Sequence, residues 1–108
     1  MLILIKTETG YGTEEVKCQK CFRIWKTIFF IRYEKGINMF IISSLETGKL
    51  VYQSINQDMN GVIKEFKKHF KDNFTKEQFF LRKEKARKIF EKTGFAYPLN
   101  KDNGCSNK

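Results

Sequence analysis

The stretch from Gly61 to Gly94 constrains the fold most, because its residues repeat with the period of an α-helix. Successive helical residues are rotated by about 100°, so residues three and four apart share a face. In the first half of the stretch, apolar residues follow this spacing on one side and lysines follow it on the other. The apolar residues are Val62, Ile63, Phe66 and Phe70, and the lysines are Lys64, Lys67, Lys68 and Lys71. The pattern predicts a helix that packs its apolar face on a core and presents a lysine face to solvent or a partner.

A second helix is predicted after Thr75. Thr75 and Gln78 have the Thr-x-x-Gln spacing of a capping box, and Gly94 stands where a helix C-terminus favours a left-handed residue. For the first helix, Asp58 or Asn60 can accept hydrogen bonds from the unpaired N–H groups of the first turn. The second helix combines an apolar face of Phe79, Ala86, Ile89 and Phe90, a lysine stripe of Lys85, Lys88 and Lys92, and a narrow acidic line of Glu84 and Glu91.

The part of the chain before these helices has the composition of β-strands. Residues 22–33 give the strongest signal and are apolar on both faces around residues 28–31, which predicts a central strand. Other strands are expected at residues 2–6, 14–21, 39–44 and 50–55, with turns at 34–36 and 46–49. The predicted fold is α+β: an antiparallel meander of four to five strands followed by two C-terminal helices packed on the sheet.

The length of the chain favours one domain. A chain of 108 residues buries roughly two-thirds of the surface that its unfolded form exposes, so a single core suffices. We expect this domain to span residues 1–99 and to be followed by a short polar tail, residues 100–108. No apolar run approaches the roughly 20 residues that a membrane-spanning helix requires.

The charge of the chain is strongly positive and uneven. The net charge is +9, and residues 57–108 carry thirteen Lys and Arg against seven Asp and Glu, whereas residues 1–56 carry eight against five. A basic surface attracts phosphate backbones or acidic proteins. Lysine suits contact with phosphates better than reading of bases, so we expect DNA or RNA binding with weak sequence specificity. The residues expected to bind are Lys64, Lys67, Lys68, Lys71, Lys85, Lys88 and Lys92.

Two alternatives to this interpretation remain open. The lysines can simply solvate the helices, as lysine does on most helical surfaces. They can also dock on an acidic protein surface, as in a non-enzymatic regulator or inhibitor. Both the nucleic-acid and the protein partner predict binding that weakens with salt; only the first predicts that generic DNA or RNA binds.

A set of aromatic and basic residues is also expected on one face of the predicted strand 22–33. Arg23, Trp25, Phe29 and Tyr33 alternate there, and such a surface can stack unpaired bases beside a cation. Arg23 and Trp25 are therefore added to the candidate nucleic-acid-binding residues. The alternative is that this face is a core surface covered by a helix, since aromatic residues at a spacing of two are common in packed sheets.

The three cysteines allow a metal site but do not establish one. Cys18 and Cys21 have the Cys-x-x-Cys spacing with which two thiolates bind one Zn²⁺, and only Cys105 and His69 offer further soft ligands. Ordinary free thiols are the alternative, and a redox pair is disfavoured because the motif precedes a strand. No cofactor is otherwise expected. The odd number of cysteines and the absence of a signal peptide favour an intracellular protein that is not secreted.

Nothing in the sequence specifies an enzyme. Glu15 and Lys17 match a Glu-x-Lys fragment of metal-dependent nucleases, but no upstream aspartate completes that site. The phosphate-binding glycine loops and the serine-centred nucleophile motif are also missing. His69 is the only histidine and borders the apolar face of the first predicted helix, so we expect it to be a partly buried packing residue rather than a base.

Overall fold

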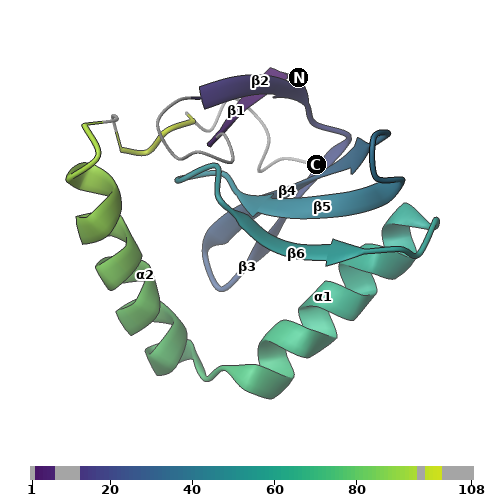
Figure 1. The fold of residues 1–108 in the computed structure, drawn as a ribbon. Coiled ribbons are helices and arrows are strands. Elements are labelled where there is room, and N and C mark those ends of the chain that lie inside the picture. The colour runs from purple at the N-terminus through teal and green to yellow at the C-terminus, as the bar shows by residue number, and fades with distance from the viewer. Residues whose placement is uncertain (1, 7–12, 95–96, 101–108) are drawn as a thin grey trace.

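The computed structural model describes residues 2–6, 13–94 and 97–100, which form two antiparallel sheets and two helices (Figure 1). A two-stranded sheet pairs β1 (Leu2–Lys6) with β2 (Thr13–Lys17). A four-stranded meander follows in chain order: β3 (Lys20–Ile24), β4 (Thr27–Glu34), β5 (Met39–Ser44) and β6 (Leu50–Ser54). The helices α1 (Met59–Asn73) and α2 (Lys76–Glu91) come last. The predicted α+β class, with strands first and two helices last, is confirmed. The predicted strand at residues 14–21 is wrong, because β2 ends at Lys17 and β3, which belongs to the other sheet, begins at Lys20.

The predicted long strand over residues 22–33 is wrong, because a tight turn divides it. Trp25 and Lys26 connect β3 to β4, with Ile24 paired to Thr27, and they have φ values of 46° and 66°. Positive φ at both central residues is the requirement of a type I′ hairpin turn, which usually contains Asn or Gly. Neither residue type occurs here, so no turn could be expected from the residues at this position. As a result β4 is a central strand and β3 lies at an edge of the sheet.

The main core lies between the four-stranded sheet and α1. Phe66 of α1 is 2% exposed, and its ring lies 5.2 Å from that of Phe29 and 6.0 Å from that of Phe22, measured between ring centres. All four residues predicted for the apolar face of this helix are buried. The cluster consists of Phe22, Ile24, Phe29, Ile31, Phe40, Ile42, Val62, Ile63, Phe66 and Phe70.

A smaller core lies on the other face of the same sheet. Side chains alternate between faces along a strand, so Cys21 and Phe30 point away from α1 while their neighbours Phe22 and Phe29 point toward it. Ile5 of β1 packs against them, which places the two-stranded sheet over this side. The buried members are Ile5, Cys18, Cys21, Phe30 and Leu45.

The helix ends are formed by the residues that the sequence indicated. Asp58 caps α1 and accepts a hydrogen bond from the backbone N–H of Gly61 at 3.1 Å. Thr75 and Gln78 form both hydrogen bonds of the capping box of α2, and Gly94 has a φ of 87°. Among the described residues, no helix is long enough and apolar enough to cross a membrane.

Candidate nucleic-acid interface and aromatic cleft

The lysines of α1 lie on the side of the helix that faces away from the sheet. Lys64, Lys68 and Lys71 are exposed, and Lys67 is half-buried. None of the four forms an ion pair with a carboxylate in the described part of the chain. The side chains of the predicted lysine face therefore lie at the surface of α1, that of Lys67 only in part.

Glu65 is the one acid between these lysines, and its carboxylate is directed at β6. It accepts hydrogen bonds from Asn56 Nδ2 at 3.0 Å, Ser54 Oγ at 2.9 Å and Tyr52 Oη at 3.4 Å. The bonds from Asn56 and Ser54 hold the pKa of Glu65 below its usual value. Since these donors occupy the carboxylate, Glu65 stabilises the contact of α1 with the sheet and does not pair with the lysines. Asp72 is the remaining acid of α1 and lies at its exposed C-terminal end.

The edge strand β3 runs beside α1 and adds to the lysine face. Lys20 Nζ lies 3.5 Å from Asn60 Oδ1, at the start of the helix, and Lys67 Nζ lies 5.7 Å from the centre of the Phe22 ring. Asn60 therefore contacts β3 and does not cap α1. The surface made by Lys20, Lys64, Lys67, Lys68 and Lys71 is called the α1–β3 basic band below.

The lysines of α2 lie in a different electrostatic setting. Lys85, Lys88 and Lys92 are exposed, as the sequence predicts. Beside them, however, Arg87 pairs with Glu84 at 3.7 Å and with Glu91 at 3.3 Å. Acidic side chains thus alternate with the basic ones on α2, whereas the α1–β3 basic band carries an uninterrupted run of lysines.

The predicted stacking surface is not formed. Trp25 lies in the β3–β4 turn, where its ring is 5.1 Å from that of Phe70 and 6.0 Å from that of Phe79. Phe29 is 2% exposed beneath α1, and Tyr33 packs on the ring of Phe40 at 4.9 Å. The hairpin also places Arg23 on the opposite face of the sheet from these aromatic residues, because it pairs with Ile28. The alternative interpretation, a core face covered by a helix, is therefore correct for the aromatic residues.

The two cysteines of the Cys-x-x-Cys motif lie together in the smaller core. Their sulfur atoms are 3.5 Å apart, and burial raises the pKa of the Cys18 thiol. His69 is on α1, on the other face of the sheet, and Cys105 lies outside the described residues. The described residues contain no group of three or more His, Cys, Asp or Glu side chains placed to hold a metal ion.

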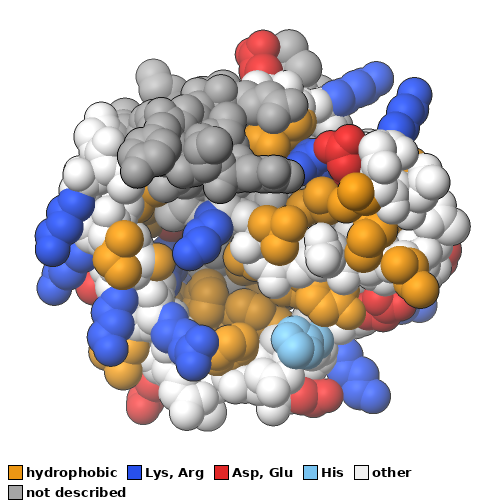
Figure 2. Space-filling view, viewed as in Figure 1, with side chains coloured by type: hydrophobic (Ala, Val, Ile, Leu, Met, Phe, Trp, Pro, Cys, Tyr) orange, Lys and Arg blue, Asp and Glu red, His pale blue; other side chains and the backbone are white. Residues whose placement is uncertain are grey.

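A cleft of about 330 Å³ lies between the sheet, the C-terminal half of α1 and the inward side of α2. Figure 2 looks into it: hydrophobic side chains lie at the bottom, and Lys, Arg and His side chains lie around them. Its apolar wall is made mainly by Phe29, Phe66, Phe70, Phe74 and Phe79. The charged residues and the histidine that line it are Glu46, Lys49, His69, Arg82 and Lys83. We call this feature the aromatic cleft.

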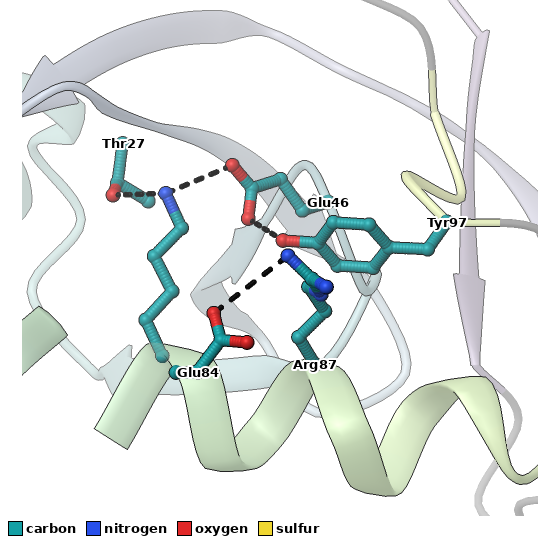
Figure 3. Close-up of polar contacts among 6 residues, drawn as sticks. Thr27, Glu46, Glu84, Arg87 and Tyr97 are labelled. Atoms are coloured by element: carbon teal, nitrogen blue, oxygen red, sulfur yellow. Dashed lines mark hydrogen bonds and ion pairs between the residues drawn. The ribbon is translucent and has the colours of Figure 1, made fainter. Parts of the chain in front are cut away.

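A polar network attaches α2 to the sheet at one side of the aromatic cleft (Figure 3). Lys83 Nζ lies 3.0 Å from Glu46 Oε1 and donates a hydrogen bond to Thr27 Oγ1 at 3.1 Å. Tyr97 Oη donates to the other carboxylate oxygen of Glu46, and the Arg87 guanidinium lies 5.9 Å from the Tyr97 ring centre. Burial, together with the bond to Glu46, raises the pKa of Tyr97, so the phenol stays protonated at neutral pH.

Part of the aromatic cleft could be found in the sequence, and part could not. Phe79 and Ala86 were predicted on the apolar face of α2, and both line the cleft; Phe90 of the same face is buried. Ile89 was assigned to that face too, but it is 67% exposed. Ala86 stands seven residues, or about two helical turns, after Phe79 on the same side of α2, and its small side chain is exposed at the cleft. His69 packs on the ring of Tyr52 at 5.6 Å at the cleft border, and it is exposed rather than partly buried.

Comparison with known proteins adds no identification: no family model matches the chain, and neither a curated protein nor a solved structure resembles it at a significant level.

Proposed function

We propose that this protein binds the phosphate backbone of DNA or RNA through the α1–β3 basic band, without enzymatic activity and with weak sequence specificity. The observation that supports the proposal is the position of Glu65. Its carboxylate is engaged by three donors on and after β6, so the lysines around it remain without a neutralising partner in the described part of the chain. Lysines crowded in this way repel one another in the free protein, and bound phosphates relieve that repulsion.

The dimensions of α1 suit a run of phosphates. Lys64 and Lys71 are seven residues apart, which is about 10 Å along a helix that rises 1.5 Å per residue. A nucleic-acid strand presents a phosphate about every 3.4 Å along the axis of a duplex, so the lysines span about three phosphates of one strand. Each lysine is a flexible point charge, which fits backbone contact and gives little discrimination between bases.

The test is a gel shift with single-stranded and double-stranded DNA and RNA of mixed sequence, run at ~50 and ~200 mM salt. If each of the five lysines of the α1–β3 basic band neutralises about one phosphate, the affinity should fall by roughly several hundred-fold between these concentrations. A protein that retards none of the four probes at the lower salt contradicts the proposal. In that case an acidic protein surface becomes the better candidate for the partner of the basic band.

A matched pair of variants locates the contact. The triple variant Lys64→Gln, Lys68→Gln, Lys71→Gln removes three charges from α1, and Lys85→Gln, Lys88→Gln, Lys92→Gln removes three from α2. All six side chains are exposed, so both proteins should fold. We expect the α1 variant to bind at least tenfold more weakly than the α2 variant. Equal losses would mean that net charge, and not the α1–β3 basic band, determines binding.

A further inference from the structure

We propose that the aromatic cleft is a binding site for a small amphipathic carboxylate, an unbranched acyl chain with one terminal carboxylate group. The proposal is independent of nucleic-acid binding, since the cleft lies on the inward sides of the helices and the α1–β3 basic band lies on the outward side of α1. Three properties of the cleft support it: its apolar wall, the charge at its border and its closed flanks.

The wall of the cleft is suited to an alkyl chain. Phenylalanine rings from β4, α1 and α2 line it, and Val51 of β6 and Ala86 of α2 complete the apolar surface. Its volume of about 330 Å³ is at the lower end of the range of ligand-binding pockets, which are mostly apolar with a few polar groups at fixed positions. Each methylene moved from water into such a site contributes favourably.

The border of the cleft carries an excess of positive charge. Its one carboxylate, that of Glu46, is occupied by Lys83 and Tyr97. Arg82 and Lys49 lie at the border without a carboxylate partner among the described residues. An anion with an apolar body is therefore complementary to the cleft: the chain lies against the rings and the carboxylate reaches the Arg82 guanidinium, which is suited to carboxylate binding.

Contacts on both sides of α2 limit the cleft to a small ligand. On one side the Arg82 guanidinium lies 4.8 Å from the centre of the Phe74 ring, where the two helices join. On the other side Lys83 bonds to Thr27 of β4 and to Glu46 of the turn between β5 and β6. A partner helix has a diameter of about 10 Å with its side chains and needs an open groove. These contacts interrupt such a groove, so an acyl chain is the better match.

Trp25 provides a direct assay, because it is the only tryptophan and packs on two residues of the cleft, Phe70 and Phe79. The probe is decanoate, titrated below its micellar concentration while tryptophan emission is recorded, with stoichiometry from isothermal titration calorimetry. We expect saturable binding of one decanoate per chain and at least tenfold weaker binding of decyltrimethylammonium, which has the same chain length and the opposite charge. Equal binding of the two probes, or no binding of decanoate, overturns the proposal.

Two pairs of variants test the position of the site. Ala86→Phe fills the cleft and should abolish decanoate binding, whereas Leu81→Phe, at a position 68% exposed, should not. Arg82→Gln should weaken decanoate binding about tenfold, whereas Lys88→Gln on the outward side of α2 should leave it unchanged. Wild-type affinity in Ala86→Phe overturns the proposal. If Ala86→Phe does not fold, the comparison of Arg82→Gln with Lys88→Gln decides, because both change only a charged end group.

Discussion

The helices α1 and α2 have almost the same length, 15 and 16 residues, and both begin with a side-chain cap, yet they are attached to the sheet in different ways. α1 buries four apolar residues, whereas α2 buries only Phe90. The contacts of α2 include the ring of Phe79, 4.7 Å from that of Phe70, and the polar contacts of Lys83 with Glu46 and Thr27. Figure 1 shows the outcome as two arms of a V, with the sheet lying closely along α1. Capping and length determine where these helices form, and their side chains determine how firmly they pack.

This difference divides the molecule into a stable part and a part that opens more easily. Local stability follows the number of buried apolar contacts, so α1 and the meander should unfold together and α2 should exchange its amide protons first. The proposed sites follow the same division: the basic band lies on the helix that buries four apolar residues, and one wall of the aromatic cleft lies on α2, which buries one.

Phe66→Ala should have the largest effect. The side chain is 2% exposed at the centre of the main core, and removing a buried phenylalanine costs about 3–5 kcal/mol of unfolding free energy. Phe80→Ala on α2 is the matched control: that side chain is 42% exposed, and its loss should cost below about 1 kcal/mol. Urea denaturation measures both. Similar losses would contradict the assignment of α1 as the helix that carries the core.

Lys83→Met should have a smaller effect that is confined to α2. The substitution keeps an apolar stem of similar length but removes the ion pair with Glu46 and the bond to Thr27, which together contribute roughly 1–2 kcal/mol. Hydrogen exchange followed residue by residue should show faster exchange in α2 and little change in α1. Faster exchange throughout both helices would mean that α2 is not an independently opening unit.

Glu65→Gln should have the smallest effect, and one that depends on pH. The pKa of Glu65 is lower in the folded protein than its usual value of 4.5, so its ionised form adds stability that is present above that value. This contribution disappears as pH falls through the lowered pKa. The difference in unfolding free energy between the wild type and Glu65→Gln should therefore shrink as the pH falls from 7 to below 4.5. A difference that stays constant over this range would contradict the role of the carboxylate in holding α1 to β6.

Local signals in the sequence were sufficient for most of the fold. The spacing of Val62, Phe66 and Phe70 predicted the buried face of α1, and the capping box at Thr75 predicted the start of α2. The same reasoning failed at Trp25 and Lys26, because these two residues form a tight turn although neither is a turn-forming residue. Trp25 packs there against Phe70 and Phe79, which are distant in the sequence, and such contacts cannot be recognised from local residues.

The aromatic cleft could not be predicted for a different reason. Its border depends on contacts between residues that are far apart in the sequence, such as Lys83 with Thr27, separated by 56 positions. The periodicity of one helix indicates which residues face inward, but not whether a neighbouring element meets them. The lysine face of α1 needed no such information, since exposure of a lysine is the default on a helix.

The order of strands in the meander also has a consequence for how the chain folds during synthesis. Because β3, β4, β5 and β6 pair in the order in which they are made, the sheet can form from contacts between sequence neighbours, which favours rapid folding. Its aromatic face then lacks a cover until α1 has been synthesised. A nascent chain that stops near Asp58 exposes Phe22, Phe29 and Phe40 on one surface, and exposed apolar sheets of this kind aggregate. The aromatic face of the sheet is therefore covered only when α1 is available to pack on it.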